Sequence, residues 1–298
     1  MKEKIEGLKK ERNAVILAHN YQPPEIQDLA DLCGDSLELS IRAAETDADV
    51  IVFCGVRFMA ETASILSPEK TVLLPKEDAG CPMADTVTAA ALAEKIARLP
   101  PMPVVTYVNS TAEVKALSTI CCTSANAAAV LQSLPEEELL MVPDRNLARY
   151  AAARTGKKVH PWNGCCPYHD RLTVEEVEQA RRAHPGAVFM AHPECPPPVL
   201  EAADVVASTS GMLRCARESE AEAFIVGTEI GLLYPLQKEN PEKRFYPASE
   251  KMYCADMKKI GAADVARCLE TLEGKVKVPE KVRVPAYQAV KRMIDLNL

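Results

Sequence analysis

The sequence predicts an α/β fold made of three repeated domains, each a parallel sheet with helices on both faces. Three observations lead to this prediction. Apolar, β-branched runs alternate with helical stretches, this alternation repeats three times along the chain, and a cysteine stands at the same point of each repeat. Strands that alternate with helices are typical of parallel sheets, because each crossover helix packs on a face of the sheet.

The first strand of each repeat is an apolar run that ends in polar residues. These runs are residues 14–18, 103–108 and 187–191, followed by His19-Asn20-Tyr21, Asn109-Ser110-Thr111 and His192-Pro193-Glu194. Further strands are predicted at 50–54, 139–142 and 223–226, and short ones near Val72, Val159 and Phe245. Since functional residues of such folds lie at the carboxyl ends of strands, the polar segments should face the crevices between domains.

A helix is predicted to open soon after each first strand at a small polar pair. The pairs are Asp35-Ser36, Thr123-Ser124 and Ser208-Thr209, whose side-chain oxygens suit the free amides of a first helical turn. Free amides and the helix dipole attract anions, so Ser36, Ser124 and Thr209 are candidates for binding a phosphate or carboxylate. The alternative is that they only cap their helices.

The repeats also set the expected domain boundaries. The first domain comprises residues 1–82 plus 257–298, the second 83–168, and the third 169–256. Helical runs at 262–272 and 286–296 are expected to pack back on the first domain. A strand-like stretch at 275–278 lies between them.

The composition argues against several classes of protein. The 298 residues contain no apolar run of membrane-spanning length, and residues 1–13 are charged rather than of signal-peptide type, so a cytoplasmic protein without a membrane partner is expected. A net charge of −7 argues against a nucleic-acid surface and leaves small acidic metabolites open. Eleven cysteines without secretory context favour reduced thiols or a metal site over a disulfide framework.

Cys81, Cys166 and Cys254 recur at nearly even intervals, each just after the last predicted strand of a repeat. The first two lie in turn-rich loops, where a thiol is rarely buried for packing alone. Proline follows both Cys81 and Cys166, as it does beside iron–sulfur ligands, which favours Cys166 over its neighbour Cys165.

Two kinds of metal centre are compatible with such thiols. Structural zinc sites usually show paired C-x₂₋₄-C spacing and four ligands, a pattern that these cysteines lack. Three separated thiolates fit a 4Fe-4S cluster whose fourth iron has no protein ligand and can bind substrate as a Lewis acid. Spacing alone leaves both possibilities open.

Ten segments of the chain, in order, resemble the quinolinate synthase family over essentially the whole length. They are Ile16-Leu-Ala-His-Asn-Tyr-Gln22, Gly34-Asp-Ser36, Phe58-Met-Ala-Glu61, Cys81-Pro-Met83, Tyr107-Val-Asn-Ser-Thr111, Thr123-Ser-Ala-Asn126, Pro143-Asp-Arg-Asn-Leu147, Asn163-Gly-Cys-Cys-Pro-Tyr-His169, His192-Pro-Glu-Cys195 and Gly227-Thr-Glu229. Ten ordered matches make a coincidence implausible.

The resemblance implies three αβα three-layer domains around a pseudo-threefold axis, with a cluster and active site at the centre. It implies a 4Fe-4S cluster on Cys81, Cys166 and Cys254. The implied reaction condenses iminoaspartate with dihydroxyacetone phosphate to quinolinate, with loss of phosphate and water, for de novo NAD biosynthesis. An aspartate oxidase or dehydrogenase is the implied source of iminoaspartate.

Residue chemistry and the resemblance together suggest a site. Imidazoles and a perturbed carboxylate move protons near neutral pH, so the expected catalytic residues are Tyr21, Glu194, His19 and His192. The expected substrate contacts are His19, Ser36, Met59, Tyr107, Asn109, Ser124, His169, His192, Glu194, Ser208 and Thr209. The working hypothesis is that Glu194 and Tyr21 carry enol and imine proton transfers while the open iron assists dehydration and cyclisation.

Two other functions are kept as alternatives. A zinc-stabilised binding scaffold would show bound zinc, no brown colour and no sensitivity to oxygen. An iron–sulfur electron carrier would need neither the His192-Pro193-Glu194 segment nor three matched helix caps.

Overall fold

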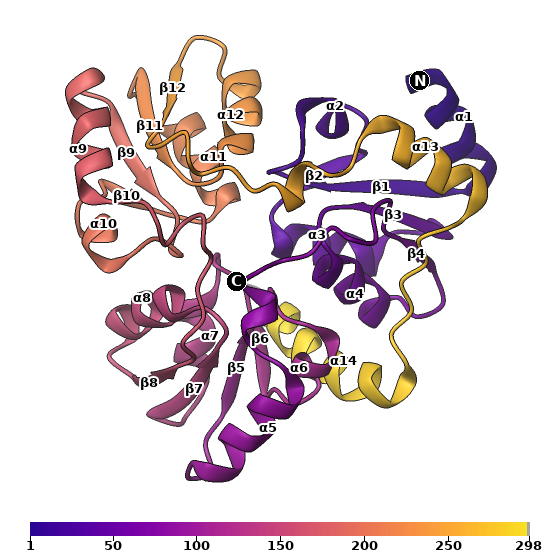
Figure 1. The fold of residues 1–298 in the computed structure, drawn as a ribbon, viewed down its shortest axis with the longest axis horizontal. Coiled ribbons are helices and arrows are strands. Elements are labelled where there is room, and N and C mark those ends of the chain that lie inside the picture. The colour runs from indigo at the N-terminus through magenta and orange to yellow at the C-terminus, as the bar shows by residue number, and fades with distance from the viewer. Residues whose placement is uncertain (297–298) are drawn as a thin grey trace.

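The structure is a computed structural model that describes residues 1–296, and it contains three four-stranded parallel sheets. All three have the same strand order, β2-β1-β3-β4, β6-β5-β7-β8 and β10-β9-β11-β12. Figure 1 shows the sheets as three groups of elements around a common centre. The predicted α/β class with three repeats is therefore confirmed, whereas the pseudo-threefold axis and the domain boundaries stay predictions.

The first sheet consists of β1 (Ala14–His19), β2 (Leu32–Gly34), β3 (Val50–Cys54) and β4 (Thr71–Leu73). Its helices are α1 (Lys2–Arg12), α2 (Pro24–Gln27), α3 (Ser36–Glu45) and α4 (Arg57–Leu66). All five residues of β3 are buried, which explains its continuous apolar run, because helices cover both faces of the sheet. Figure 1 shows α1 on one side of this sheet and α3 with α4 on the other.

The other two sheets repeat this arrangement. The second has β5 (Val104–Tyr107), β6 (Ile120–Cys122), β7 (Glu138–Val142) and β8 (Lys158–Pro161), with helices η1 (Ala84–Thr86), α5 (Ala89–Arg98), α6 (Ala112–Lys115), α7 (Ala127–Ser133) and α8 (Arg145–Thr155). The third has β9 (Val188–Ala191), β10 (Val205–Val206), β11 (Ala223–Gly227) and β12 (Arg244–Pro247), with helices α9 (Val174–Ala183), α10 (Pro197–Glu201), α11 (Thr209–Glu218), η2 (Ile230–Leu232), α12 (Leu233–Glu239) and η3 (Asp256–Lys258). The nine predicted strands are all present, and β2, β6 and β10 were not predicted.

The C-terminal segment returns to the first sheet, as predicted, but also reaches the second. Helix α13 (Ala262–Thr271) packs against α1 and β3. Helix α14 (Glu280–Asp295) begins six residues before the predicted run and packs against α4 as well as α6 and β6. Between these helices, the amide of Val276 donates to Val72 and the carbonyl of Gly274 accepts from Leu74, so this stretch pairs along the edge strand β4.

Two of the three predicted helix caps are present. Asp35 caps α3 in a capping box with Glu38, and Ser208 caps α11 by accepting the amide of Gly211. The prediction was wrong at Thr123-Ser124, because α7 begins later, at Ala127. There the side chain of Asn126 accepts the amide of Thr123 at 2.7 Å, which holds residues 123–126 in a turn before the helix.

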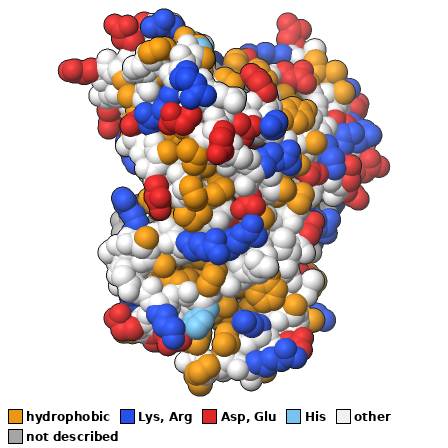
Figure 2. Space-filling view, turned by 60° about the vertical axis from the view of Figure 1, so that its left-hand side comes forward, with side chains coloured by type: hydrophobic (Ala, Val, Ile, Leu, Met, Phe, Trp, Pro, Cys, Tyr) orange, Lys and Arg blue, Asp and Glu red, His pale blue; other side chains and the backbone are white. Residues whose placement is uncertain are grey.

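No helix within residues 1–296 is long and apolar enough to cross a membrane. Figure 2 shows one face of the molecule, where acidic and basic side chains are interspersed with hydrophobic ones. The cytoplasmic location and the lack of a nucleic-acid partner stay predictions.

Candidate active site

One cavity lies where the three repeats meet, and its lining comes from all of them. Its lining includes the three predicted metal ligands and all but one of the other predicted site residues: Cys81, Cys166, Cys254, His19, Tyr21, Ser36, Met59, Tyr107, Asn109, Ser124, His169, His192, Glu194 and Thr209. Residues far apart in the sequence thus converge because the first strand of each repeat ends at this cavity.

Ser208 is the predicted site residue that does not line the cavity. Its hydroxyl accepts the amide of Gly211 and donates to Asp35 at 3.3 Å, so its contacts are a helix cap and a link between α11 and α3. Ser36 and Thr209 are the first residues of α3 and α11 and do line the cavity. Ser124 lies in the turn before α7, where its hydroxyl is 3.1 Å from Nε2 of His192.

The turns after β1 and β9 have the same local structure. The amide of Tyr21 donates to Nδ1 of His19 at 3.2 Å, and the amide of Glu194 donates to Nδ1 of His192 at 3.3 Å. Each imidazole therefore accepts at Nδ1 and carries its proton on Nε2 when neutral. Burial lowers the pKa of both His19 and His192 to about 3, so both rings are neutral at physiological pH.

These two histidines are expected to make folding stability depend on pH. Their folded pKa lies below the unfolded value of about 6.5, so the unfolded chain binds more protons and stability falls as the pH drops below 6.5. Each histidine should contribute about 1 kcal/mol of loss between pH 7 and pH 5.5. Urea unfolding of the cluster-free chain at both pH values measures this, and His192→Gln should lower the loss by about 1 kcal/mol. An unchanged pH dependence in that variant would contradict the assignment.

A chain of buried side chains connects Tyr21 to Glu194. The Tyr21 hydroxyl is 2.6 Å from Oγ1 of Thr228, which is 2.8 Å from Nε2 of His169. Nδ1 of His169 is in turn 2.8 Å from Oε2 of Glu194. The chain joins residues of the first and third repeats, and each link is short enough to pass a proton.

Burial, neighbouring charges and hydrogen bonds set the protonation states of Glu194 and Tyr21, the two ends of this hydrogen-bonded series. Burial alone would raise the pKa of Glu194, but the nearby imidazoles of His169 and His192 and hydrogen bonds from His169 and Tyr107 outweigh it, so the pKa lies below its usual range. Burial, followed by the Glu194 charge, raises the pKa of Tyr21 well above 10. Glu194 is therefore ionised at neutral pH and accepts hydrogen bonds, whereas Tyr21 keeps its hydroxyl proton.

Asn109 offers a free acceptor to a ligand. Its Oδ1 is buried and has no hydrogen-bond partner among residues 1–296, although the side chain lines the cavity. A buried carbonyl oxygen without a donor is costly, and a bound polar molecule would satisfy it. This is independent support for Asn109 as a substrate contact.

The cysteine loops are held by two carboxylates that the sequence analysis did not assign. The amide of Cys166 donates to Asp144 at 3.0 Å, and the amide of Cys254 donates to Glu229 at 3.1 Å. Asp144 and Glu229 each lie two residues beyond the end of their strand, β7 or β11, and each also caps the helix that follows. Burial raises the pKa of Asp144, with the Glu194 charge as a second cause, while its backbone donors oppose that rise.

The thiols of the three cysteines are suited to a group larger than one ion. Burial raises the pKa of Cys81 to about 12 and of Cys254 to about 11, so both need a cation before they become thiolates. Within residues 1–296, the three sulfurs do not form a group whose members all lie within 4.8 Å of one another. A single tetrahedral ion would draw its thiolates closer than that, whereas a multi-iron cluster holds them farther apart.

Thr228 and Lys258 contact residues that line the cavity and were missed because they gave no distinctive pattern. Thr228 follows β11 in a segment that carries the family resemblance but was given no role. Lys258 forms an ion pair with Glu229 at 2.8 Å and donates to the carbonyl of Tyr21. The repeat of carboxylates at equivalent strand ends was the signal that could have found Asp144 and Glu229.

A cavity between three α/β repeats, lined by histidine, tyrosine and glutamate side chains and by three cysteines, is typical of an α/β enzyme that acts on a small molecule. Comparison with known proteins gives the family. The family model for quinolinate synthetase A protein matches residues 3–295, so the chain belongs to the quinolinate synthase family.

Individual relatives agree over nearly the whole chain. Quinolinate synthase of Geobacter sp. (strain M21) is 56% identical over 296 residues, which cover 99% of this chain and 97% of the relative. Those of Geotalea uraniireducens (strain Rf4) and Thermodesulfovibrio yellowstonii are 55% and 54% identical, with the same coverage. The predicted family is confirmed.

Proposed function

We propose that the chain condenses iminoaspartate with dihydroxyacetone phosphate to form quinolinate for NAD biosynthesis, with a 4Fe-4S cluster held by Cys81, Cys166 and Cys254. Membership of the family supports the reaction. The observation that carries the proposal is that one cysteine from each repeat lines the same cavity as the chain from Tyr21 to Glu194. An aspartate oxidase or dehydrogenase would supply the unstable iminoaspartate.

The donor set fits the proposed cluster. The three thiols come from loops and line one cavity, and their sulfurs are not all within 4.8 Å of one another, which favours a cluster over a single zinc ion. When bound to Cys81, Cys166 and Cys254, the cluster would supply a Lewis-acidic iron without a protein ligand. An electron carrier does not need a buried series of hydrogen-bonded side chains beside its cluster. The geometry therefore also favours an enzyme over the electron carrier.

Substrate anions would bind at two helix N-termini. Ser36 and Thr209 begin α3 and α11, where their hydroxyls line the cavity and the helix dipole favours a phosphate or carboxylate. The free Oδ1 of Asn109 would accept a hydrogen bond from a hydroxyl or imine of the substrate. Met59 supplies an apolar wall, which excludes water from the reacting atoms.

The proton transfers are assigned to Tyr21 and Glu194, which lie at the two ends of the buried series of hydrogen-bonded side chains. The Glu194 carboxylate would remove a proton from carbon or nitrogen as the enol and imine form. The Tyr21 hydroxyl would donate to the leaving oxygen, and the hydrogen bonds through Thr228 and His169 would return a proton from Glu194 to Tyr21. His19 and His192, both neutral, would donate from Nε2 to substrate oxygens.

Turnover of the two substrates by the purified chain tests this function. Under anaerobic conditions, the cluster-loaded chain should release quinolinate and phosphate in equal amounts from iminoaspartate and dihydroxyacetone phosphate. Omission of either substrate is the control. A loaded chain that releases neither product would show that the proposed reaction is wrong.

Removal of either cysteine-holding carboxylate is expected to weaken retention of the cluster. Asp144→Ala and Glu229→Ala each free a cysteine amide and loosen its loop, so the cluster should be lost to a chelator about tenfold faster. Absorbance during anaerobic chelator challenge measures the rate. Thr173→Ala is the matched control, because it removes the cap of α9 without touching a cysteine. Equal rates in all three variants would rule out a specific role for the carboxylates.

A further inference from the structure

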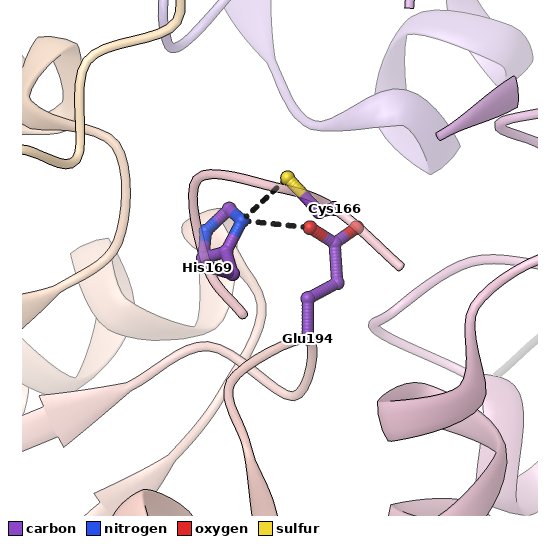
Figure 3. A group of neighbouring side chains, drawn as sticks. All are labelled: Cys166, His169 and Glu194. Carbon is purple, nitrogen blue, oxygen red and sulfur yellow. Dashed lines mark hydrogen bonds and ion pairs between the residues drawn. The ribbon is translucent and has the colours of Figure 1, made fainter. Parts of the chain in front are cut away.

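Three different ligand atoms meet at one point of the cavity wall. Nδ1 of His169 lies 3.1 Å from Sγ of Cys166 and 2.8 Å from Oε2 of Glu194. All three atoms lie within 4.8 Å of one another, and Figure 3 shows them pointing toward a common centre. The side chains of His169 and Glu194 are only 3% and 4% exposed. Neither Cys81 nor Cys254 belongs to this group.

This set of donors suits a single zinc ion. Thiolate, imidazole and carboxylate are its ordinary protein ligands, and three of them leave a fourth position for water. Here the open position would face the cavity that these side chains line. One thiolate and one carboxylate balance the two charges of the ion, so the buried complex has no net charge.

Neighbouring residues already hold two of the ligands in place. Nε2 of His169 is 2.8 Å from Oγ1 of Thr228, so when an ion takes the lone pair of Nδ1, the ring proton can sit on Nε2 and donate to this hydroxyl. The amide of Cys166 donates to Asp144, which fixes the loop that carries the thiol. Little rearrangement is therefore needed for an ion to bind.

We propose that, in the cluster-free chain, Cys166, His169 and Glu194 bind one zinc ion, and that this ion blocks assembly of the cluster. On binding, the Cys166 thiol releases its proton to solvent and its sulfur bonds to zinc, with no change of oxidation state. The site itself depends only on the geometry of the three side chains. The proposed block of cluster assembly rests on the proposed function, because it requires that Cys166 is a ligand of the 4Fe-4S cluster as well as of the zinc ion.

Cobalt is the probe for this site. The cluster-free chain, titrated anaerobically with Co²⁺, should bind one ion, with thiolate-to-cobalt absorption in the near ultraviolet and the visible bands of a four-coordinate ion. Zinc should displace the cobalt at one equivalent. A chain that shows no thiolate-to-cobalt absorption would overturn the proposal.

The three cysteines provide matched variants. Cys166→Ala should abolish the thiolate band, and His169→Gln and Glu194→Gln should weaken cobalt binding by about 100-fold. Cys81→Ala and Cys254→Ala remove thiols from the same cavity and should bind cobalt as the wild type does. Equal loss in all three cysteine variants would place the ion on the cysteines instead and overturn the proposal.

Cluster reconstitution of the zinc-loaded wild type tests the block separately. Uptake of iron and sulfide should be prevented until a chelator removes the zinc. Uptake that proceeds with zinc still bound would refute the block. If the zinc-free wild type takes up no cluster, the proposed function fails, while the cobalt result still decides the zinc site.

Discussion

Glu194→Gln is expected to lower quinolinate formation by about 10³-fold, because the substitution removes the proton acceptor and keeps the shape of the side chain. The carboxylate lies at the end of the chain from Tyr21 and accepts from His169 at 2.8 Å. An amide cannot take up a proton at this position. Product formation by the loaded variant, measured under saturating substrates, gives the effect on kcat.

The cluster content of the same variant separates chemistry from folding. Glu194 is not one of the three proposed cluster ligands, so Glu194→Gln should hold the same iron and sulfide as the wild type. Tyr21→Phe removes the hydroxyl at the other end of the hydrogen-bonded series from Glu194. It serves as a companion variant and should also lower the rate of quinolinate formation. Full activity of Glu194→Gln would remove this residue from the mechanism.

Cys166→Ala is expected to abolish cluster binding and, with it, all turnover. Its sulfur is one of only three proposed protein ligands, and it comes from the second repeat, so the other two repeats have no substitute for it. The measurement is iron and sulfide per chain after anaerobic reconstitution, together with the brown absorbance of the cluster.

The neighbouring cysteine provides the control. Cys165 is half-buried, contacts Asp170 and does not line the cavity. Cys165→Ala should therefore keep the full cluster and its turnover. The reverse pattern, with Cys165→Ala losing the cluster and Cys166→Ala keeping it, would contradict the choice of ligand.

The two central strands and one edge strand of each sheet could be predicted from sequence, whereas the other edge strands, β2, β6 and β10, could not. Strands such as β3 are buried on both faces, which gives a continuous apolar run that is easy to recognise. Strands β2, β6 and β10 have only two or three residues, too few for any periodicity to show. The start of α14 was also missed, because Pro285 lies inside this helix and proline usually marks a boundary.

The residues of the candidate site were found where a strand end or a loop made them conspicuous. His19, Tyr21 and Glu194 follow apolar runs, so their place at the centre could be expected. Thr228 could not be given a role in this way, because its partner Tyr21 lies 207 residues away and only the packing of the repeats brings them together. The same holds for the ion pair of Glu229 with Lys258.

The most direct test of the account is the Mössbauer spectrum of the chain loaded anaerobically with iron-57. The central claim is that three cysteines, one from each repeat, hold a four-iron cluster with one iron free for substrate. This predicts four irons per chain, with one site whose signal changes when a substrate or product analogue is added and three that do not change. Four equivalent irons whose Mössbauer signals do not change when the analogue is added would contradict the account. A chain that binds no iron would also contradict it.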